Sequence, residues 1–126
     1  MNTKAYLFHN LSELDTAIRN LEALIHVKMG LVEKETITDE EFHHRVKVDL
    51  RNLINRSNEL MIQVGHDSWL PDNIYSYLKK IRACLEKLKK IKYTKSFSQF
   101  KINKTNKIIN KVDMHISHIE QIIADL

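Results

Sequence analysis

The sequence predicts an all-α protein, an antiparallel up-down-up-down four-helix bundle. Two observations lead to this prediction. Apolar residues recur at steps of three and four along four segments of similar length, which is the spacing of helices that pack at a shallow angle. The 126-residue chain also contains only two glycines and one proline, whereas sheet proteins need turn residues far more often. The expected architecture is a single domain over residues 1–126, with helices at about 10–34, 39–64, 71–93 and 98–126.

The first helix is expected to begin at Asn10, a residue type that often caps the free N–H groups of a helix start. Glu13, three residues later, fits the pattern of a capping box. The residues before Asn10 are expected to form a short leader that packs Tyr6, Leu7 and Phe8 against one end of the domain. The apolar stripe of this helix consists of Leu11, Leu14, Ile18, Leu21, Ile25 and Val32.

The second helix is expected to begin after Thr38, whose hydroxyl can accept a hydrogen bond from the Glu41 N–H in a Thr-x-x-Glu capping box. Asp39, Glu40 and Glu41 place negative charge in the first turn, where the helix dipole favours it. Gly65 follows the last apolar residue, in the position where a helix stop needs a positive φ. The apolar stripe consists of Val46, Leu50, Leu53, Ser57, Leu60 and Val64.

Pro71 suits the first turn of the third helix, because the N–H that proline lacks would have no helical partner there. The third stripe consists of Ile74, Leu78, Ile81, Leu85, Leu88 and Ile91. The fourth helix follows a turn at Thr94–Ser98. Its stripe consists of Ile102, Thr105, Ile109, Val112, Ile116, Ile119, Ile123 and Leu126.

A second apolar row on the fourth helix, formed by Ile108, Met114 and Ile122, makes its apolar face unusually wide. A face of this width is either buried centrally or left for another subunit. We expect a homodimer.

Positive charge is concentrated between Lys79 and Lys111, where the chain holds twelve of its twenty Lys and Arg residues and one acid, Glu86. Such a stretch either binds an anionic partner or forms a solvated face. If it binds a partner, we expect a ridge on the fourth helix to do so, together with two neighbours on the third. The candidate binding residues are Lys101, Lys104, Lys107 and Lys111 on the ridge, with Lys87 and Arg82 beside it.

In an up-down bundle, the first and third connections lie at the same end of the molecule. The acids near the first connection are Glu33, Glu35, Asp39, Glu40 and Glu41. The cations near the third connection are Lys89, Lys90, Lys92 and Lys95. We expect the two groups to pair partly, which would reduce the positive field that remains for a partner.

The seven histidines raise the question of a metal site. Glu41-x-x-His44 has the spacing of a ligand pair in di-iron bundles, but such sites need a second Glu-x-x-His on another helix, and none appears there. No metal or other cofactor is expected. His44-x-x-Lys47 resembles the motif of histidine phosphotransfer domains, which are also four-helix bundles. Those domains place a Gly after the Lys, where this chain has Val48.

Arg19, Asn20 and His26 fit the loose Arg-x(4–6)-His pattern of HEPN-type helical ribonucleases. The resemblance implies that Arg19 would hold a phosphate and that His26 would act in acid–base chemistry. The pattern lies on the first helix here, whereas the family carries it near the start of a late helix.

No Gly-rich phosphate loop and no Ser/His/Asp set can be assembled from the sequence. The chain also shows no signal-peptide pattern, no membrane span and no cysteine pair, so we expect a cytoplasmic protein. We expect a non-enzymatic bundle that binds another macromolecule, most readily a protein, as an inhibitor, an immunity or antitoxin-like protein, or an adaptor. The alternatives are a nucleic-acid-binding protein that uses the basic helix 3–4 hairpin, and a HEPN-like ribonuclease.

Overall fold

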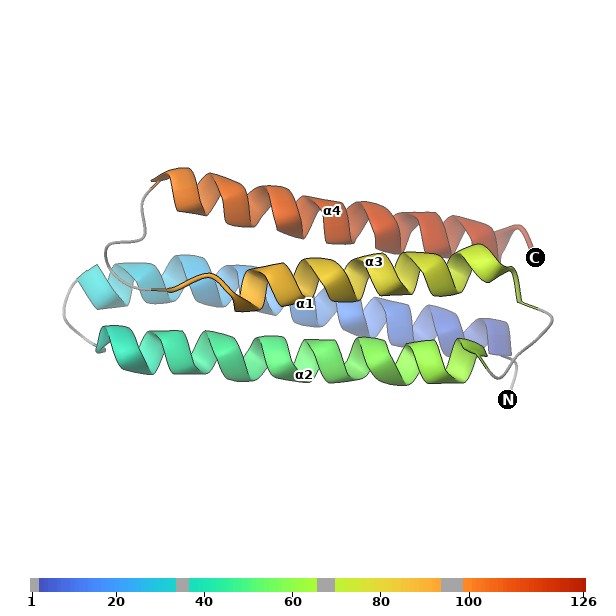
Figure 1. The fold of residues 1–126 in the computed structure, drawn as a ribbon, viewed down its shortest axis with the longest axis horizontal. Coiled ribbons are helices and arrows are strands. Elements are labelled where there is room, and N and C mark those ends of the chain that lie inside the picture. Colours follow the sequence, from blue (N-terminus) through green and yellow to red (C-terminus); the bar gives the residue numbers. More distant parts are fainter. Residues whose placement is uncertain (1–2, 34–36, 66–69, 94–98) are drawn as a thin grey trace.

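The computed structural model describes residues 3–33, 37–65, 70–93 and 99–126, and within them all side chains except those of residues 3, 26–33 and 99. It confirms the all-α prediction and shows four helices arranged as an up-down bundle (Figure 1). The helices are α1 (Thr3–Glu33), α2 (Asp39–Gly65), α3 (Asp72–Lys89) and α4 (Gln99–Ala124).

Each helix packs against its neighbour in sequence, and α1 packs against α4, which closes the ring. In the described chain, neither diagonal pair, α1 with α3 or α2 with α4, approaches as closely. The end of α1 and the start of α2 lie at one end of the bundle, together with the end of α3 and the start of α4 (Figure 1). The start of α1 and the end of α4 lie at the opposite end.

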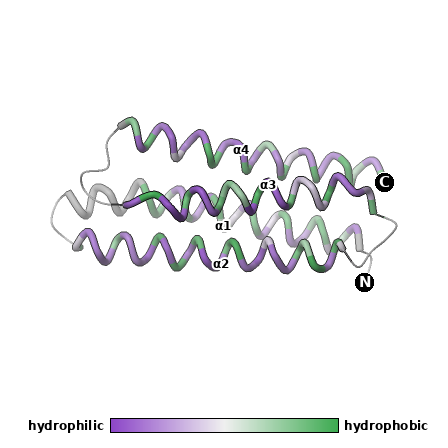
Figure 2. Tube along the Cα trace, viewed as in Figure 1, coloured by the Kyte–Doolittle hydropathy of each residue, from purple (hydrophilic) through white to green (hydrophobic). Residues whose placement is uncertain are grey.

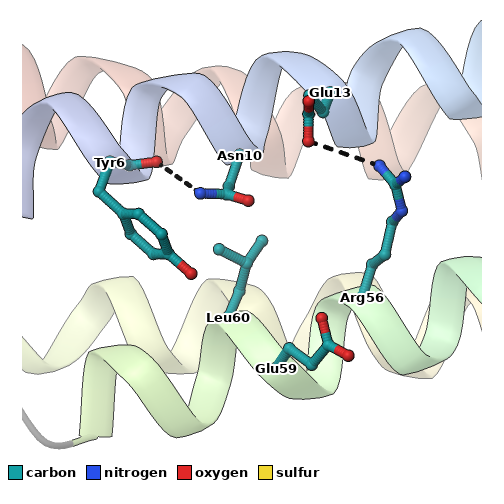
Figure 3. A pocket seen from close by; sticks show the side chains of 6 residues that line it. All are labelled: Tyr6, Asn10, Glu13, Arg56, Glu59 and Leu60. Atoms are coloured by element: carbon teal, nitrogen blue, oxygen red, sulfur yellow. Dashed lines mark hydrogen bonds and ion pairs between the residues drawn. The ribbon is translucent and has the colours of Figure 1, made fainter.

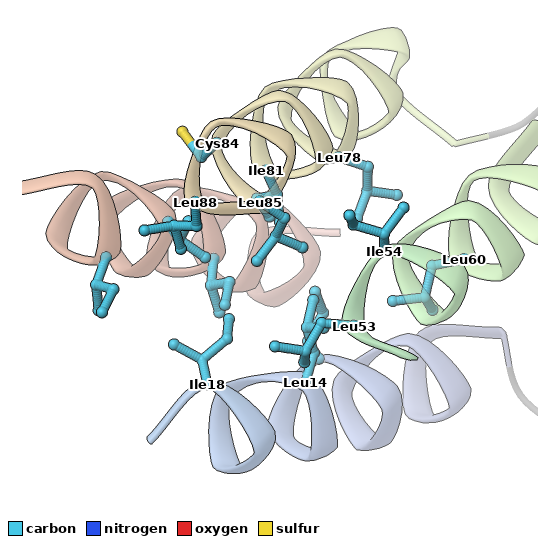
Figure 4. Close-up of a cluster of buried hydrophobic side chains, with 14 of the residues drawn as sticks. Leu14, Ile18, Leu53, Ile54, Leu60, Leu78, Ile81, Cys84, Leu85 and Leu88 are labelled. Atoms are coloured by element: carbon cyan, nitrogen blue, oxygen red, sulfur yellow. The ribbon is translucent and has the colours of Figure 1, made fainter. Parts of the chain in front are cut away.

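The core follows the predicted apolar stripes. Hydrophobic and hydrophilic residues alternate along each helix (Figure 2). Every predicted stripe residue of α2 is buried, and Figure 4 shows leucines and isoleucines of α1, α2 and α3 pointing into one interior. Burying one such side chain is worth about 1.5–3 kcal/mol, so the shared core is the main source of helix stability. The exceptions are Ile91 and Ile102, which are half-buried, and Leu126, which is exposed; the Val32 side chain lies outside the described residues.

Two polar residues of the predicted stripes, Ser57 and Thr105, are buried in the core, and the hydroxyl of each makes a hydrogen bond. The Ser57 hydroxyl donates to the Ile54 carbonyl at 2.8 Å, and the Thr105 hydroxyl donates to the Lys101 carbonyl at 2.9 Å. Each hydroxyl is thus satisfied by its own helix, which makes its burial inexpensive.

The expected start of α1 at Asn10 is wrong. The helix begins seven residues earlier, at Thr3, and the Asn10 side chain donates to the Tyr6 carbonyl at 2.8 Å instead of capping a helix start. Leu7 lies one turn before Leu11 and is buried, so the apolar stripe continues through the expected leader. Burial of Leu7 favours continued helix over a cap at Asn10.

The predicted start of α2 is confirmed, because the Glu41 N–H donates to the Thr38 hydroxyl oxygen at 3.1 Å. Its end differs slightly from the prediction. Gly65 is the last residue of the helix and does not have a positive φ. The space around its Cα is open, so the chain does not need a glycine there for steric reasons.

The third helix ends at Lys89, four residues earlier than expected. The N–H groups of Lys90 and Ile91 then donate to the carbonyls of Lys87 and Leu88 at 3.2 Å, which tightens the final turn. Tyr93 follows with its side chain completely buried, and its hydroxyl donates to the Leu88 carbonyl at 2.7 Å.

Candidate binding surface

The outward face of α4 carries a second stripe at helical spacing. Its members, which we call the outer stripe, are Phe100, Lys104, Lys107, Lys111 and Met114, and all five side chains are exposed. They recur at steps of four and three, as the core residues of α4 do, but on a different side of the helix. The outer stripe is therefore a continuous surface of three cations between two apolar side chains.

The two apolar members of the outer stripe are unusually accessible for their size. Phe100 is 76% exposed and Met114 is 48% exposed. They are fourteen residues apart, which corresponds to about 21 Å along a helix axis. Covering such side chains releases apolar surface from water and gives a partner two anchor points.

The structure places the predicted ridge residues Lys104, Lys107 and Lys111 together on the outer stripe. Lys101 is also exposed, but it follows Phe100 directly and so lies about a third of a turn away from the stripe. Three of the four predicted ridge residues thus share one face of α4.

The sequence predicts Met114 in an apolar row with Ile108 and Ile122, but Ile108 is buried and Met114 is exposed on the outer stripe. The pairing of Met114 with Phe100 was not predicted, although the steps from Phe100 to Lys104 and from Lys111 to Met114 could have revealed it.

Lys87 of α3 and Lys111 of α4 both act on the Cys84 thiol, so both lie on the side of the bundle where α3 meets α4. Burial raises the pKa of Cys84, and the two lysines oppose that rise only in part. Cys84 is buried, as its apolar neighbours in the sequence predicted. In Figure 4 its sulfur points away from the centre of the core, toward the outside of α3.

Arg82 is not beside the ridge. Its guanidinium donates to the Asn58 side chain on α2 at 3.2 Å, so it lies on the α2 flank of α3. Since α2 and α4 occupy opposite corners of the bundle, the structure separates Arg82 from the outer stripe. The sequence places Arg82 correctly on the third helix but does not show which neighbour it faces.

The end of α1 and the start of α2 lie at the same end of the bundle as the end of α3 and the start of α4, and cations of α2 and α3 act on one another there (Figure 1). The positive charges that act on His43 are Lys47 and Lys92, and Lys89 acts on Lys47. Burial and these neighbours lower the pKa values of both His43 and Lys47. The expected partners Glu33, Glu35 and Lys95 have side chains outside the described residues.

A cleft between α1 and α2 has a volume of about 190 Å³ and a mixed lining (Figure 3). Arg56 reaches across it to Glu13 at 3.7 Å, and Glu59 lies beside them. With both signs of charge present, this cleft lacks the single-sign field that would select a charged ligand.

The Arg19 of the HEPN-like pattern lies among carboxylates. Its guanidinium pairs with Asp113 of α4, with Glu22 at 3.3 Å and with Asp15 at 3.8 Å. Three negative neighbours oppose the approach of a phosphate. The His26 side chain lies outside the described residues.

Within the described ranges, no three His, Cys, Asp or Glu side chains are grouped closely enough to hold a metal ion. Both Glu41 and His44 are exposed on α2. A membrane-spanning helix needs both length and apolar character, and none of the described helices combines the two.

Comparison of the chain with protein-family models, with curated proteins and with solved structures found no match.

Proposed function

We propose that this protein is a non-enzymatic binding protein, and that its partner is another protein that docks an acidic amphipathic helix on the outer stripe of α4. The observation that carries the proposal is the order of side chains on that stripe: an exposed aromatic ring, three lysines and an exposed methionine. A partner helix with two apolar anchors about 21 Å apart and acids between them would match it.

The apolar anchors would supply most of the affinity in such a complex. Fully covering Phe100 is worth up to about 1.5–3 kcal/mol before the cost of association, and covering Met114, which is 48% exposed, is worth about half as much. The exposed lysines would add at most about 1 kcal/mol per ion pair, but they would steer an acidic partner and speed its association. An inhibitor, an immunity or antitoxin-like protein, or an adaptor would all work in this way.

The same stripe fits a nucleic acid less well. Its cations are all lysines, whereas phosphate and base recognition draws heavily on the bidentate guanidinium of arginine. It offers one exposed aromatic ring, Phe100, where single strands are usually held by several stacked rings. Met114 would have no favourable contact with a phosphate backbone.

The experiment begins with a partner captured from the source cells and then purified. Its affinity is measured by calorimetry at several salt concentrations, for the parent protein and for two variants that each lose four charges. The test variant changes Lys101, Lys104, Lys107 and Lys111 to Gln. The control variant changes Arg45, Arg51, Lys79 and Lys90, which are exposed on α2, α3 and the turn after α3, to Gln.

The proposal predicts that the test variant, which lacks the four ridge lysines and is called the ridge variant below, binds the partner at least tenfold more weakly and with a shallower salt dependence. The control variant should bind like the parent. A further variant, Phe100→Ser with Met114→Ser, should also weaken binding, with the salt dependence unchanged. Equal losses in the ridge and control variants would show that only net charge matters and would overturn the proposal. Retention on DNA that the ridge variant loses, without any protein partner, would favour the nucleic-acid alternative.

A further inference from the structure

Next to the outer stripe, on its α3 side, two histidines of α4 surround a tyrosine of α3. The ring of Tyr77 lies 5.7 Å from the ring of His115 and 5.2 Å from the ring of His118, measured between centroids. The Lys80 ammonium lies 5.1 Å from the centre of the same tyrosine ring. We call His115, His118, Tyr77 and Lys80 the histidine-pair site.

In both histidines one ring nitrogen, Nδ1, is withdrawn from solvent. The Nδ1 atoms of His115 and His118 are buried and have no hydrogen-bond partner. A proton on Nδ1 would create a buried, unsatisfied donor, so the neutral rings are best assigned with the proton on Nε2. Each ring can then present an Nε2–H donor; a protonated ring also would, but its buried Nδ1–H adds to the cost of protonation in the free protein.

The charges that act on the pKa of His115 are positive. They come from Lys80 on α3 and from Lys111 and His118 on α4, and together with burial they lower the pKa of His115. Asp113, two residues before His115, instead pairs with Arg19 of α1 on the other flank of the helix. A metal cation would be repelled by these lysines, whereas an anion would relieve their mutual repulsion.

We propose that the histidine-pair site binds an oxyanion, namely a sulfate- or phosphate-sized group held by the two histidine Nε2–H groups and the Lys80 ammonium. Lys111, at the border with the outer stripe, adds to the positive potential. The ligand can be a free anion or a phosphoryl group carried by a larger molecule, because both present the same tetrahedral oxygens.

Binding to this site should tighten as the pH falls. A bound anion stabilises the protonated form of His115, so its pKa rises in the complex, and the complex takes up a proton. A rise of one unit in the pKa of one histidine corresponds to about tenfold tighter binding well below that pKa. Sulfate is the suitable probe because it remains a dianion throughout this pH range, whereas phosphate changes its own charge.

The test is a sulfate titration of the isolated protein, followed by NMR of the histidine Hε1 signals, so it does not depend on the acidic protein partner. The signals of His115 and His118 should shift with one common saturation curve that is tighter at about pH 5.5 than at about pH 8, by up to about tenfold. His44, which is exposed on α2, serves as the internal control and should not follow that curve. Calorimetry in two buffers should detect proton uptake.

Two pairs of variants complete the experiment. Lys80→Gln should weaken sulfate binding at least fivefold, whereas Lys79→Gln, the exposed neighbour in sequence, should leave it unchanged. The double variant His115→Gln and His118→Gln should abolish the pH dependence, and His44→Gln should not. The proposal is overturned if Lys79→Gln and Lys80→Gln weaken binding equally, or if His44 responds to sulfate as His115 and His118 do. A titration can also use a phosphorylated peptide to identify which form of oxyanion binds more tightly.

Discussion

Replacing His43 by alanine should loosen the chain where it leaves α3. His43 Nδ1 accepts a hydrogen bond from the Tyr93 backbone N–H at 3.1 Å, and the two rings lie 6.2 Å apart. Tyr93 is held further by its hydroxyl, which donates to Leu88, and by an edge-to-face contact with Phe42 at 6.1 Å. Together these contacts fix the first residues after α3 against α2.

The size of the effect follows from these contacts. His43→Ala removes the acceptor of the Tyr93 N–H and should cost about 1–3 kcal/mol. Tyr93→Phe should cost less, about 0.5–1.5 kcal/mol, because the Leu88 carbonyl keeps its bond from the Ile91 N–H at 3.2 Å. Tyr93→Ala empties a fully buried site and should cost about 3–5 kcal/mol. The order of the three variants is therefore part of the prediction.

His43 also makes the stability depend on pH. Burial and the positive charges of Lys47 and Lys92 lower its pKa in the folded state below the ordinary value of 6.5. The unfolded chain therefore binds a proton more readily, and stability is fully present above about pH 6.5 and is lost as the pH falls through the folded pKa. Protonation at Nδ1 would in addition replace an acceptor by a donor facing the Tyr93 N–H.

Urea denaturation at two pH values provides the assay. With a slope of about 2 kcal/mol per molar urea, His43→Ala should lower the midpoint by about 0.5–1.5 M at about pH 7.5. His43→Asn is the matched variant, because its Oδ1 can replace Nδ1 as an acceptor without titrating. Since His115 titrates in the same direction, the parent should lose more stability on acidification than His43→Asn, but both should lose some. Equal midpoints for the parent and His43→Ala at both pH values would refute this reasoning.

Three further predictions concern the core and the charged flank. Leu53→Asp should unfold the protein in circular dichroism, because Leu53 is 3% exposed, whereas Ile62→Asp on the same helix should not, because Ile62 is 63% exposed. Cys84 should react with a thiol reagent far more slowly in the native state than in urea, and equal rates would show that the thiol is accessible. A double-mutant cycle with Arg19→Gln and Asp113→Asn should give a coupling free energy of at most about 1 kcal/mol that decreases as salt is added. A coupling free energy that does not change with salt would mean that the ion pair is shielded from solvent ions more than its exposure indicates.

The helical architecture could be predicted from the sequence because it depends on local regularities. The spacing of apolar residues along α2, from Val46 to Val64, places all of them on one side of any helix, and that side must be buried. The Thr38 cap involves residues only three apart, so the chain itself brings them together. The same spacing rule puts Lys104, Lys107 and Lys111 on one face of α4.

The predictions for Asn10 and Arg82 were wrong for related reasons. Each depends on how one helix packs against another, which the local sequence does not specify. Asn10 has the chemistry of a helix cap, but burial of Leu7 in the bundle extends the helix past it. Arg82 lies on the correct helix, but only the packing of α3 against α2 decides that its guanidinium reaches Asn58.

The chain by itself thus determined the four helices, their buried sides and the concentration of lysines on α3 and α4, because each depends on residues a few positions apart. Only the tertiary structure decided which flanks of neighbouring helices face one another. That choice brings His43 to Tyr93, fifty residues later in the chain, and gathers Tyr77 and Lys80 around the two histidines of α4. The spacing of residues within one helix does not predict such contacts. They depend on how the helices pack around one core, which determines which flanks face each other.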